Sequence, residues 1–584
     1  MKPVYLPGSK GKLFVALYLP DEGYSLNHWI VHFPPFAEEM NKCRPMTSRQ
    51  ARALAASGYV VVVPDWCGTG DSQGGFGDAD WETWRQDAGS LLDWVLEQGA
   101  GTIDFWGVRT GCLLALEMLS VHGDRLRDRV GRLVFWQPVL DGEKFITRFL
   151  RMKVAVAMMA GDKITVSDLR EQVTRGDALE VAGYTLQPSL VEQLDQLKMQ
   201  DLPVPANAQV LWLEVAGAGG KPLPPASGRL VDNWRGAGLR VDTGVIEGEP
   251  FWSTQEIAFA PSLIETTSEL LGSPAPATGN PGEFEHVEPA IVPDGERPVT
   301  FSCHDSELVG VLHTVSEPVD RGVVLVVGGP QYRVGSHRQF VLLARFLAEQ
   351  GIPVFRFDYR GIGDSEGPFA GFGGIHDDIA NAIDCFQNQC PEVREVVIWG
   401  LCDAATAAAW YAGSDKRVAG LILLNPWVRS ESGAAKAYLR HYYLQRLFSR
   451  AFWQKVFSRG IAIRRSLGGL GQNVRRALGR EQSGHSPGEA NAASESGPAA
   501  GRSLAESMYT GLTKFGGETL VILSGNDLTA AEFRDAVRAS RKFRNLLAKK
   551  RFRTMSMDEA DHTFSRRDWR DRVSQMTADW LRSW

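Results

Sequence analysis

A cysteine at position 402 stands in a context that suits a nucleophile. The apolar segment that contains Ile398 and Trp399 runs into Gly400-Leu401-Cys402-Asp403-Ala404, and an alanine-rich helix is predicted directly afterwards. A sharp strand-to-helix turn needs small residues at both ends, so that the central side chain can project without a clash. The start of a helix is also expected to lower the pKa of a thiol and favour the thiolate. The pattern predicts a nucleophile elbow, with an inert buried thiol as the alternative.

A thiol nucleophile needs a base, and the base needs an acid that orients it. Asp527 follows a strand predicted over 520–523, and His562 follows one predicted over 555–557. Loops at the carboxyl ends of parallel strands meet at one edge of a sheet. We therefore predict that Cys402 is the nucleophile, His562 the general base and then acid, and Asp527 the group that orients the imidazole. Asp527 could instead cap the helix near Thr529 or lose its role to Asp561 or Asp403, and His562 could be an ordinary loop residue.

Acyl transfer also needs backbone N–H donors aimed at the developing oxyanion. The N–H of Asp403, directly after the nucleophile, is the first candidate. The second is expected in the loop after the strand at 323–327, which reads Gly328-Gly329-Pro330-Gln331. Because Pro330 has no N–H, Gln331 or Gly329 is the candidate.

The same order of predicted strand, sharp turn and helix occurs earlier in the chain. One offset of 293 positions separates Asp65 from Asp358, Gly107 from Gly400, and Arg109 from Cys402. A constant offset across strand, turn and elbow indicates an internal duplication of domain size. The nucleophile position of the first copy is thus an arginine.

The first copy also lacks the other two catalytic positions. The loop at 216–220 has no carboxylate, and the loop at 247–252 has Pro250 near the position of the base. These losses argue against the same chemistry in the first copy. Arg109 then either binds an anionic ligand or forms an ion pair with Glu247 or Glu249 that plugs the old site.

The elements that position these residues alternate between strand and helix. Strands are predicted at 13–19, 29–33, 59–63, 102–106, 133–136 and 209–215, with helices at 49–57 and 81–96. This alternation predicts, in each half, a mostly parallel sheet with helices on both faces. Each copy is interrupted by a helical insertion that would form a cap over the site. We predict a first domain at 1–271, a proline-rich linker at 272–298 and a second domain at 299–584.

The cap of the second half, about 430–510, is strongly basic. Residues 432–480 contain 11 Lys and Arg and no Asp or Glu, interleaved with aromatic residues, and 481–501 is rich in Ser, Gly, Ala and Pro. Basic amphipathic helices suit an anionic membrane surface or an acidic glycan. The alternative is a solvated cap helix that covers the site. No recognised nucleic-acid-binding module accompanies the basic segment, so we predict no nucleic-acid partner.

Composition sets the remaining limits. The 584 residues carry a net charge of -6, with 44% hydrophobic and 23% charged residues, as in a globular protein. The seven cysteines show no paired zinc-type spacing. The sequence leads us to expect neither export nor a transmembrane anchor. We expect no cofactor, no metal and a cytoplasmic location, with peripheral attachment to the inner membrane as an option.

Longer strings resemble two known families. FRFDYRGIGDSEG, WGLCDAA, YLRHYYLQRL and SGNDLTAAEF in the second half resemble type 1 exosortase A system-associated hydrolases, and PPFAEEMNKCR, PDWCGTGDS and EGEPFWSTQEI in the first half resemble type 2. The resemblance implies tandem α/β-hydrolase domains fused in one bacterial chain and linked to exosortase sorting and exopolysaccharide production. The family motif carries over onto Cys402, Asp527 and His562.

The residues and the resemblance together predict a hydrolase or acyltransferase. The second half would act on a small-molecule ester, thioester or lactone through Cys402, and the first half is predicted to be non-catalytic. The alternative is a non-catalytic scaffold or sensor of an anionic ligand in the exopolysaccharide machinery, with Arg109 and the basic cap as its binding groups.

Overall fold

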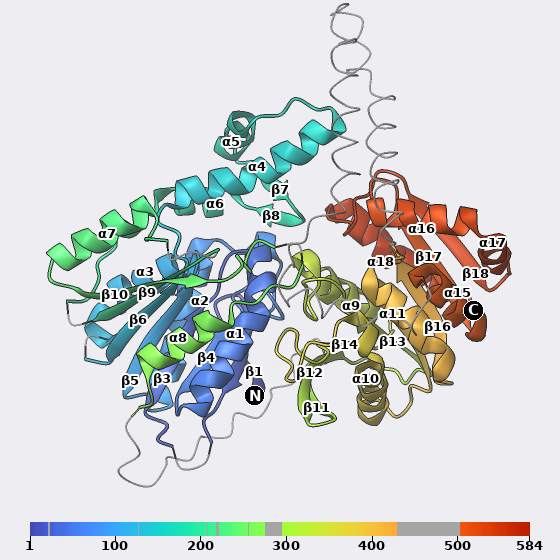
Figure 1. Ribbon diagram of the computed structural model, residues 1–584, viewed down its shortest axis with the longest axis horizontal. Coiled ribbons are helices and arrows are strands. Elements are labelled where there is room, and N and C mark those ends of the chain that lie inside the picture. Colours follow the sequence, from blue (N-terminus) through green and yellow to red (C-terminus); the bar gives the residue numbers. More distant parts are fainter. Residues whose placement is uncertain are drawn as a thin grey trace, which may run out of the picture.

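The computed structural model describes the chain except residues 22–23, 127, 207, 218–220, 255, 275–294 and 429–502. Two eight-stranded sheets lie side by side, the first half in blue and green and the second in yellow and red (Figure 1). Their strand orders are β1-β2-β4-β3-β5-β6-β9-β10 and β11-β12-β14-β13-β15-β16-β17-β18. The two orders are the same when the eight strands of each sheet are numbered along the chain, with the separate β7–β8 hairpin left out. The predicted duplication is therefore present in the fold.

The elements of the first half follow the predicted alternation. They are β1 (Lys2–Gly8), β2 (Gly11–Tyr18), β3 (His28–Phe33), α1 (Glu38–Ala56), β4 (Val60–Pro64), η1 (Phe76–Asp78), α2 (Trp81–Glu97), β5 (Thr102–Val108), α3 (Gly111–Leu126), β6 (Val130–Trp136), α4 (Gly142–Ala160), α5 (Val166–Thr174), β7 (Leu179–Val181), β8 (Tyr184–Leu186), α6 (Pro188–Gln196), η2 (Met199–Asp201), β9 (Gln209–Ala216), α7 (Pro225–Gly236), β10 (Arg240–Glu247) and α8 (Pro261–Leu271). The segment from α4 to η2 is the predicted insertion, and it also contains the short β7–β8 hairpin.

The second half repeats this order. It contains β11 (Glu296–Cys303), β12 (Ser306–His313), β13 (Arg321–Val326), η3 (Ser336–Arg338), α9 (Gln339–Glu349), β14 (Val354–Phe357), η4 (Phe372–Gly374), α10 (His376–Gln389), β15 (Glu395–Leu401), α11 (Asp403–Tyr411), η5 (Ala412–Ser414), β16 (Val418–Leu424), α15 (Leu504–Lys514), β17 (Glu518–Ser524), α16 (Leu528–Ala539), α17 (Arg541–Leu547), β18 (Phe552–Met557) and α18 (Arg567–Leu581). The predicted basic cap lies outside the described residues up to position 502, and its last part belongs to α15.

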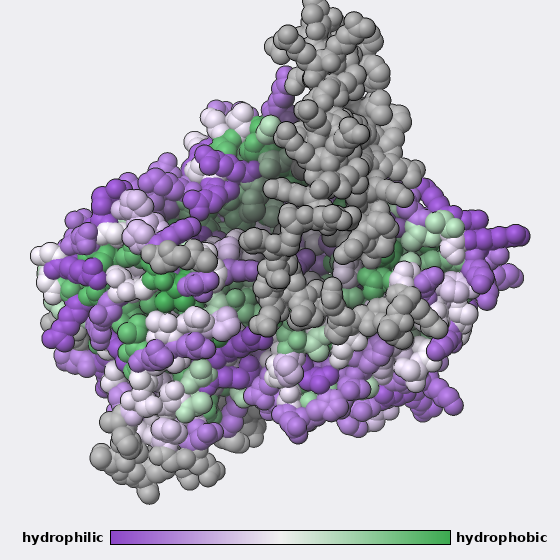
Figure 2. All heavy atoms as spheres, in the orientation of Figure 1, coloured by the Kyte–Doolittle hydropathy of each residue, from purple (hydrophilic) through white to green (hydrophobic). Residues whose placement is uncertain are grey.

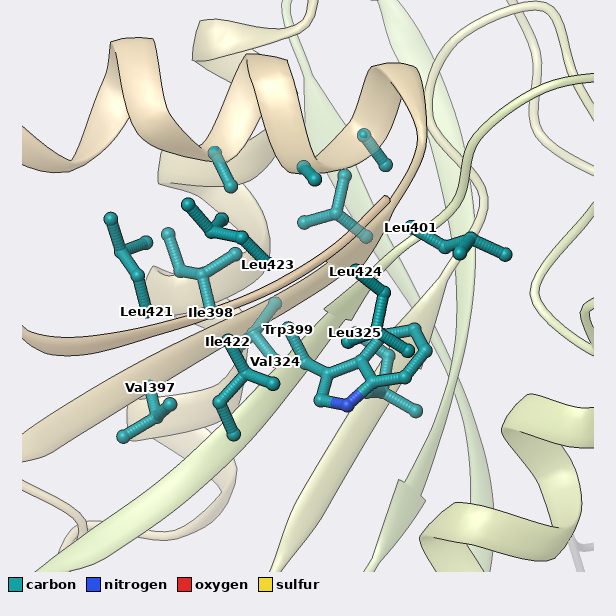
Figure 3. Close-up of a cluster of buried hydrophobic side chains, with 14 of the residues drawn as sticks. Val324, Leu325, Val397, Ile398, Trp399, Leu401, Leu421, Ile422, Leu423 and Leu424 are labelled. Carbon is teal, nitrogen blue, oxygen red and sulfur yellow. The ribbon is translucent and has the colours of Figure 1, made fainter. Parts of the chain in front are cut away.

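The pairing confirms the predicted fold class. In the second sheet β12 pairs antiparallel with β11 and β14, whereas every later pair from β13 to β18 is parallel. The strands β13, β15 and β16 are apolar on both faces, as buried parallel strands are. Their Val, Ile and Leu side chains pack beneath a covering helix in the core that Figure 3 shows. These central strands end at the loops that carry the predicted site.

Two predicted boundaries were wrong. The linker at 272–298 is too long by three residues, because β11 already begins at Glu296, and Pro298 is tolerated there since β11 is an edge strand. The first predicted helix, 49–57, actually begins at Glu38 and contains Pro45. Its first turns bury polar side chains such as Asn41 and Arg44, so they lack the apolar periodicity that marks a helix.

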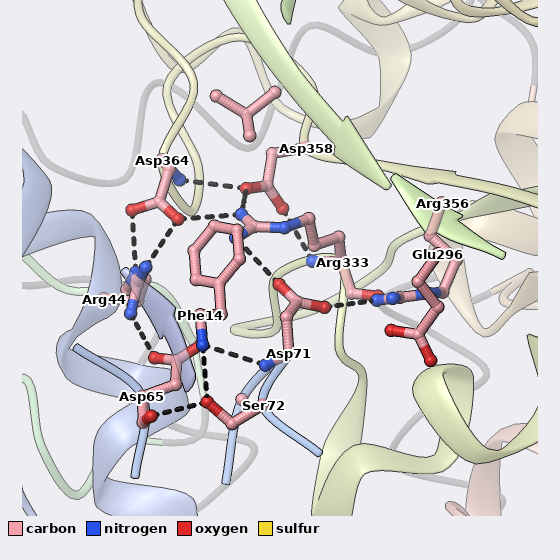
Figure 4. A network of polar contacts seen from close by, with 12 residues as sticks. Phe14, Arg44, Asp65, Asp71, Ser72, Glu296, Arg333, Arg356, Asp358 and Asp364 are labelled. Carbon is pink, nitrogen blue, oxygen red and sulfur yellow. Dashed lines mark hydrogen bonds and ion pairs between the residues drawn. The ribbon is translucent and has the colours of Figure 1, made fainter. Parts of the chain in front are cut away.

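A buried network of charges joins the two halves (Figure 4). Arg44 of α1 contacts Asp65 of its own half at 2.7 Å and Asp364 of the other half at 2.7 Å. Arg333 contacts Asp358 of its own half at 2.5 Å and Asp71 of the other half at 2.8 Å. Arg333 also contacts Asp364 of its own half at 2.8 Å. Each half thus supplies an arginine that binds aspartates of both halves.

The loops that carry these aspartates are turns that the aspartates themselves close. Asp65 and Asp358 accept the N–H of Asp71 and Asp364, respectively, at 2.9 Å, and this closes each turn. All four carboxylates are fully buried. Buried charges need partners, and here those partners come from both halves.

The face of the molecule in Figure 2 is mostly hydrophilic, with apolar side chains gathered in separate areas. Within the described ranges, no helix is long and apolar enough to span a bilayer.

Candidate active site

Cys402 lies at a sharp turn between β15 and α11. Its φ of 62° and ψ of −121° are outside the regions that non-glycine residues usually occupy, which is the strain expected of a nucleophile elbow. A side chain at Gly400 would approach the backbone of Ala404 to 2.8 Å, and Ala404 is itself fully buried. The small residues on both sides of Cys402 are therefore required by the geometry of the turn.

The structure brings Cys402, His562 and Asp527 together. His562 Nδ1 lies 3.0 Å from Asp527 Oδ1, and the imidazole also hydrogen-bonds to the Cys402 thiol. Asp527 accepts the N–H groups of Thr529 and Ala530 as the cap of α16, so its predicted alternative role is real as well. A carboxylate that is fixed by two backbone donors is a rigid support for the imidazole.

The contacts of the three residues set their protonation. Burial would lower the pKa of His562, but the hydrogen bonds to Asp527 and Cys402 outweigh it and raise this pKa to about 11. Burial raises the pKa of Cys402 above its usual 9.0, although His562 and the N–H of Asp403 act in the opposite direction. The predicted lowering of the thiol pKa by the start of the helix is therefore wrong. Burial of the thiol raises this pKa by more than the start of the helix lowers it.

Asp403 has an unexpected side-chain role. Its carboxylate accepts the N–H of Gly329 at 3.0 Å and that of Ala404 at 2.9 Å. Burial raises the pKa of this carboxyl, and its negative charge is one reason why the pKa of Cys402 is raised. The main-chain N–H of Asp403 faces the sulfur of Cys402, where the first oxyanion donor was predicted.

The second predicted donor lies in the loop after β13. Gly329, with φ +63°, is the residue of this loop that reaches the elbow through Asp403. The side chain of Gln331 instead donates to Glu38 of the first half at 2.5 Å. Of the two candidates, Gly329 therefore has the N–H that lies beside the elbow, and this N–H is now held by Asp403.

Arg109 takes the place of the nucleophile in the first half. It has φ 56°, so the strained turn persists, and its side chain is only 10% exposed. The guanidinium binds Glu39 of α1 at 3.0 Å, donates to the carbonyl of Gln137 at 3.2 Å and lies over the ring of Trp252. The predicted ion pair exists, but its partner is Glu39 rather than Glu247 or Glu249. With its donors engaged by the protein, Arg109 is not poised to bind an anionic ligand.

Aromatic side chains fill the space next to Arg109. Phe36 makes edge-to-face contacts with four rings at centroid distances of 5.3–5.8 Å: Phe76, Trp84, Phe145 and Phe149. The cavity left between the β3 loop and α2 amounts to about 10 Å³, which is room for one water molecule. This cavity is too small for an acyl substrate.

The strand order and the elbow decide the fold. Each half has an eight-stranded sheet in which only the second strand is antiparallel. In each half a strained strand-to-helix turn also follows the central strand, which is β5 in the first half and β15 in the second. Both halves have the α/β-hydrolase fold. In the second half the candidate acid, Asp527, and the candidate base, His562, follow β17 and β18, in the chain order that this fold uses.

Comparisons with known proteins agree with this α/β-hydrolase fold. Residues 319–467 match the family model of serine aminopeptidase, S33, and residues 11–109 match that of X-Pro dipeptidyl-peptidase, the S15 family. The two matches fall on different halves, and the first of them includes Cys402. No curated protein matches the chain significantly.

Among solved structures, similar folds are found in several hydrolases. The Pyrococcus furiosus esterase Pf2001 is 14% identical, with 50% of this chain and 91% of that chain covered and a TM-score of 0.34. Est1E from Butyrivibrio proteoclasticus with bound ferulic acid is 17% identical, with coverages of 46% and 97% and a TM-score of 0.35. Pyrococcus horikoshii acylaminoacyl peptidase is 16% identical, with coverages of 49% and 41% and a TM-score of 0.33.

Sequence reasoning missed three residues around these α/β-hydrolase elbows. Glu38 and Glu39 begin α1, whose start was not predicted, and the side chain of Asp403 was considered only as a rival of Asp527. The pair of adjacent glutamates was the available signal, because acidic residues favour the first turn of a helix. In the part of the chain that the structure describes, no group of three or more His, Cys, Asp or Glu residues could hold a metal ion.

Replacing Asp403 by asparagine is expected to accelerate alkylation of Cys402 by iodoacetamide several-fold at pH 7.5. The substitution removes the negative charge that raises the pKa of the thiol, while the amide oxygen still accepts from Gly329. The rate against pH, followed by peptide mass spectrometry, should shift to lower pH. Asp377→Asn, in the first turn of α10, is the matched control and should leave the curve unchanged. An unaltered curve for Asp403→Asn would contradict the electrostatic account.

Proposed function

We propose that the second half is a hydrolase or acyltransferase that acts on an ester, thioester or lactone through Cys402. The observation that carries this proposal is the chain of contacts from Asp527 to His562 to Cys402 at a strained elbow. Strain at a buried turn is costly and is typically retained where it serves a site. The fold provides these three positions in the order that acyl-transfer enzymes use.

In the proposed reaction, the proton shared between Cys402 and His562 resides on the imidazole, whose pKa Asp527 and Cys402 raise, as the sulfur attacks the acyl carbonyl. With Nδ1 directed at Asp527, the other ring nitrogen is the one available to the sulfur. The carbonyl oxygen gains the electron pair and is stabilised by the N–H of Asp403. When the carbon–oxygen or carbon–sulfur bond to the leaving group breaks, His562 gives it the proton.

The acyl group then leaves Cys402. His562 removes a proton from water, or from an acceptor hydroxyl, and the new nucleophile attacks the thioester carbon. The carbon–sulfur bond breaks, and the sulfur recovers its proton from His562. Hydrolysis and transfer differ only in which acceptor reaches the thioester.

The carboxylate of Asp403 controls whether Gly329 can serve as a second oxyanion donor. It holds the N–H of Gly329, so that N–H becomes a second oxyanion donor only when the carboxylate turns away or is neutralised. The raised pKa of this carboxyl favours neutralisation as the substrate displaces water from the site.

For the first half we propose a supporting role without turnover. Its elbow carries Arg109 bound to Glu39, and aromatic rings fill the adjoining space. The association with exosortase sorting and exopolysaccharide production, the cytoplasmic location and the binding of an anionic membrane surface or acidic glycan by the basic cap rest on sequence alone. They are part of this proposal.

The direct test is to trap the acyl-enzyme. After a brief reaction with p-nitrophenyl acetate and acid quenching, peptide mass spectrometry should find the acetyl group on Cys402. Cys390, the other half-buried cysteine, is the internal control, because burial raises the pKa of its thiol and no histidine supports it. Equal labelling of Cys402 and Cys390 would favour a non-catalytic scaffold instead.

A further inference from the structure

The loop from Gly328 to Arg338, here called the bridging loop, lies between the two halves and borders the proposed site. At its beginning, Gly329 donates to Asp403, next to Cys402. Near its end, the Nε2–H of His337 lies 3.2 Å from the carbonyl of Thr563, next to His562. Burial lowers the pKa of His337 to about 3, so its ring is neutral and donates to this carbonyl. The bridging loop therefore reaches both the nucleophile and the base.

Glu38 of the first half holds this loop at two points. Its carboxylate accepts the side-chain amide of Gln331 at 2.5 Å and the main-chain N–H of His337 at 3.1 Å. The hydroxyl of Tyr184, from the β7–β8 hairpin, donates to the same carboxylate at 2.8 Å. Asn41 donates to the side-chain oxygen of Gln331 at 2.9 Å. A carboxylate with three donors, from the bridging loop and from the hairpin, has little freedom to move.

The fit between the hairpin and the bridging loop is equally close. Gly183, between β7 and β8, has φ +85°, and a side chain there would come within 2.4 Å of the ring of His337. Only glycine allows both this conformation and this approach. The insertion of the first half thus packs directly against a residue that contacts the histidine loop.

The position of Glu38 depends in turn on the altered elbow of the first half. Its neighbour Glu39 is bound by Arg109, which also contacts the carbonyl of Gln137 and the ring of Trp252. Arg109 therefore ties the beginning of α1 to the elbow between β5 and α3. The first turn of α1 thus connects the first elbow with the bridging loop, because Glu39 binds Arg109 and Glu38 binds the loop.

From these contacts we infer that Glu38 is a positioning residue for the proposed site, and that the Arg109–Glu39 ion pair is the anchor that places it. The first half thereby fixes the bridging loop next to Cys402 and His562. Arginine at the first elbow then has a function of its own, which is to set the geometry of the second. The inference rests on the proposed function of Cys402.

Three variants of the full chain test this inference: Glu38→Gln, Arg109→Met and their combination. With p-nitrophenyl acetate, each single variant should lower kcat on the order of tenfold with KM within about twofold, since small displacements of oxyanion donors act on the transition state. Hydrogen exchange at residues 328–338 should accelerate in both, without acceleration at 400–404. The double variant should be no worse than the poorer single variant, because both changes act on one chain of contacts.

Arg132→Met is the matched control. It also removes an ion pair of a half-buried arginine in the first half, with Asp104 at 2.7 Å, but it does not touch the bridging loop. It should leave kcat and the exchange of residues 328–338 unchanged, even if it lowers the melting temperature.

Unchanged exchange at residues 328–338 in Glu38→Gln would overturn the inference, as would fully additive losses of kcat in the double variant. Failure of the wild type to acetylate Cys402 would instead count against the proposed function. The exchange measurement still decides the inference in that case, because it needs no substrate.

Discussion

Replacing Cys402 by alanine is expected to lower kcat/KM for p-nitrophenyl acetate on the order of 10⁴-fold. Loss of the nucleophile removes the covalent route and leaves only binding and the N–H of Asp403, and such residual sites are slower by this order or more. Initial rates of purified full-length protein, with the uncatalysed rate subtracted, give the ratio. Circular dichroism should be unchanged, because the turn keeps its small flanking residues.

Two further variants test whether the loss of activity is specific to the proposed catalytic residues. Cys390→Ala should retain the wild-type rate, since this residue lies at the end of α10 with no catalytic partner. His562→Asn should lose activity to a similar extent as Cys402→Ala, and the double variant should be little worse, because the residues of a triad act as a unit. Full activity of Cys402→Ala would end the nucleophile proposal and leave the scaffold as the better explanation.

The second large effect concerns the network between the halves. Arg333→Met is expected to lower the free energy of unfolding by about 3–5 kcal/mol, the usual cost of leaving buried charges without their partner. Its side chain is fully buried and contacts Asp71, Asp358 and Asp364 at 2.5–2.8 Å. Urea unfolding of the full chain at pH 7 measures the change.

Acid should reveal the same contacts. Burial alone would raise the pKa of Asp71, but Arg333 and Arg356 outweigh it and lower this pKa from 3.8 to about 2. A lowered pKa contributes stability above the unfolded value, and that stability disappears as the pH falls through the folded value. Wild-type stability should therefore decrease between pH 4 and pH 2, and Arg333→Met should already lack most of this contribution at pH 7.

Arg321→Met is the control for Arg333→Met. Arg321 forms a partly exposed ion pair with Glu395 at 2.7 Å, a class of contact that contributes about 0–1 kcal/mol. A loss for Arg333→Met as small as that for Arg321→Met would mean that water or rearrangement compensates the buried carboxylates.

Much of the fold was predictable because the chain repeats itself. The offset that relates Asp65 to Asp358 and Arg109 to Cys402 was sufficient to predict the turns and elbows of both halves from the sequence. The positions of Asp527 and His562 were predictable as well, because strands that end at one sheet edge bring their loops together. The structure places His562 beside Cys402, and Asp527 against His562.

What the sequence could not provide depends on contacts between distant segments. The partner of Arg109 is Glu39, at the start of a helix whose polar face is buried against the other half and therefore carries no apolar signal. The raised pKa of Cys402 depends on the depth at which the thiol lies, and no local motif encodes that depth. Asp403 was placed correctly for its main-chain N–H, but the direction of its side chain followed only from the path of the β13 loop.

The aspartate at position 71 bears on what counts as a domain in this protein. Both of the cations that contact it, Arg333 and Arg356, belong to the second half, each at 2.8 Å. A first half cut free at the interdomain segment would expose this carboxylate and leave it without its counter-ions. The sequence therefore contains two folding patterns, but Asp71 reaches its counter-ions only when both halves are present, as in a dimer whose two subunits have become one polypeptide.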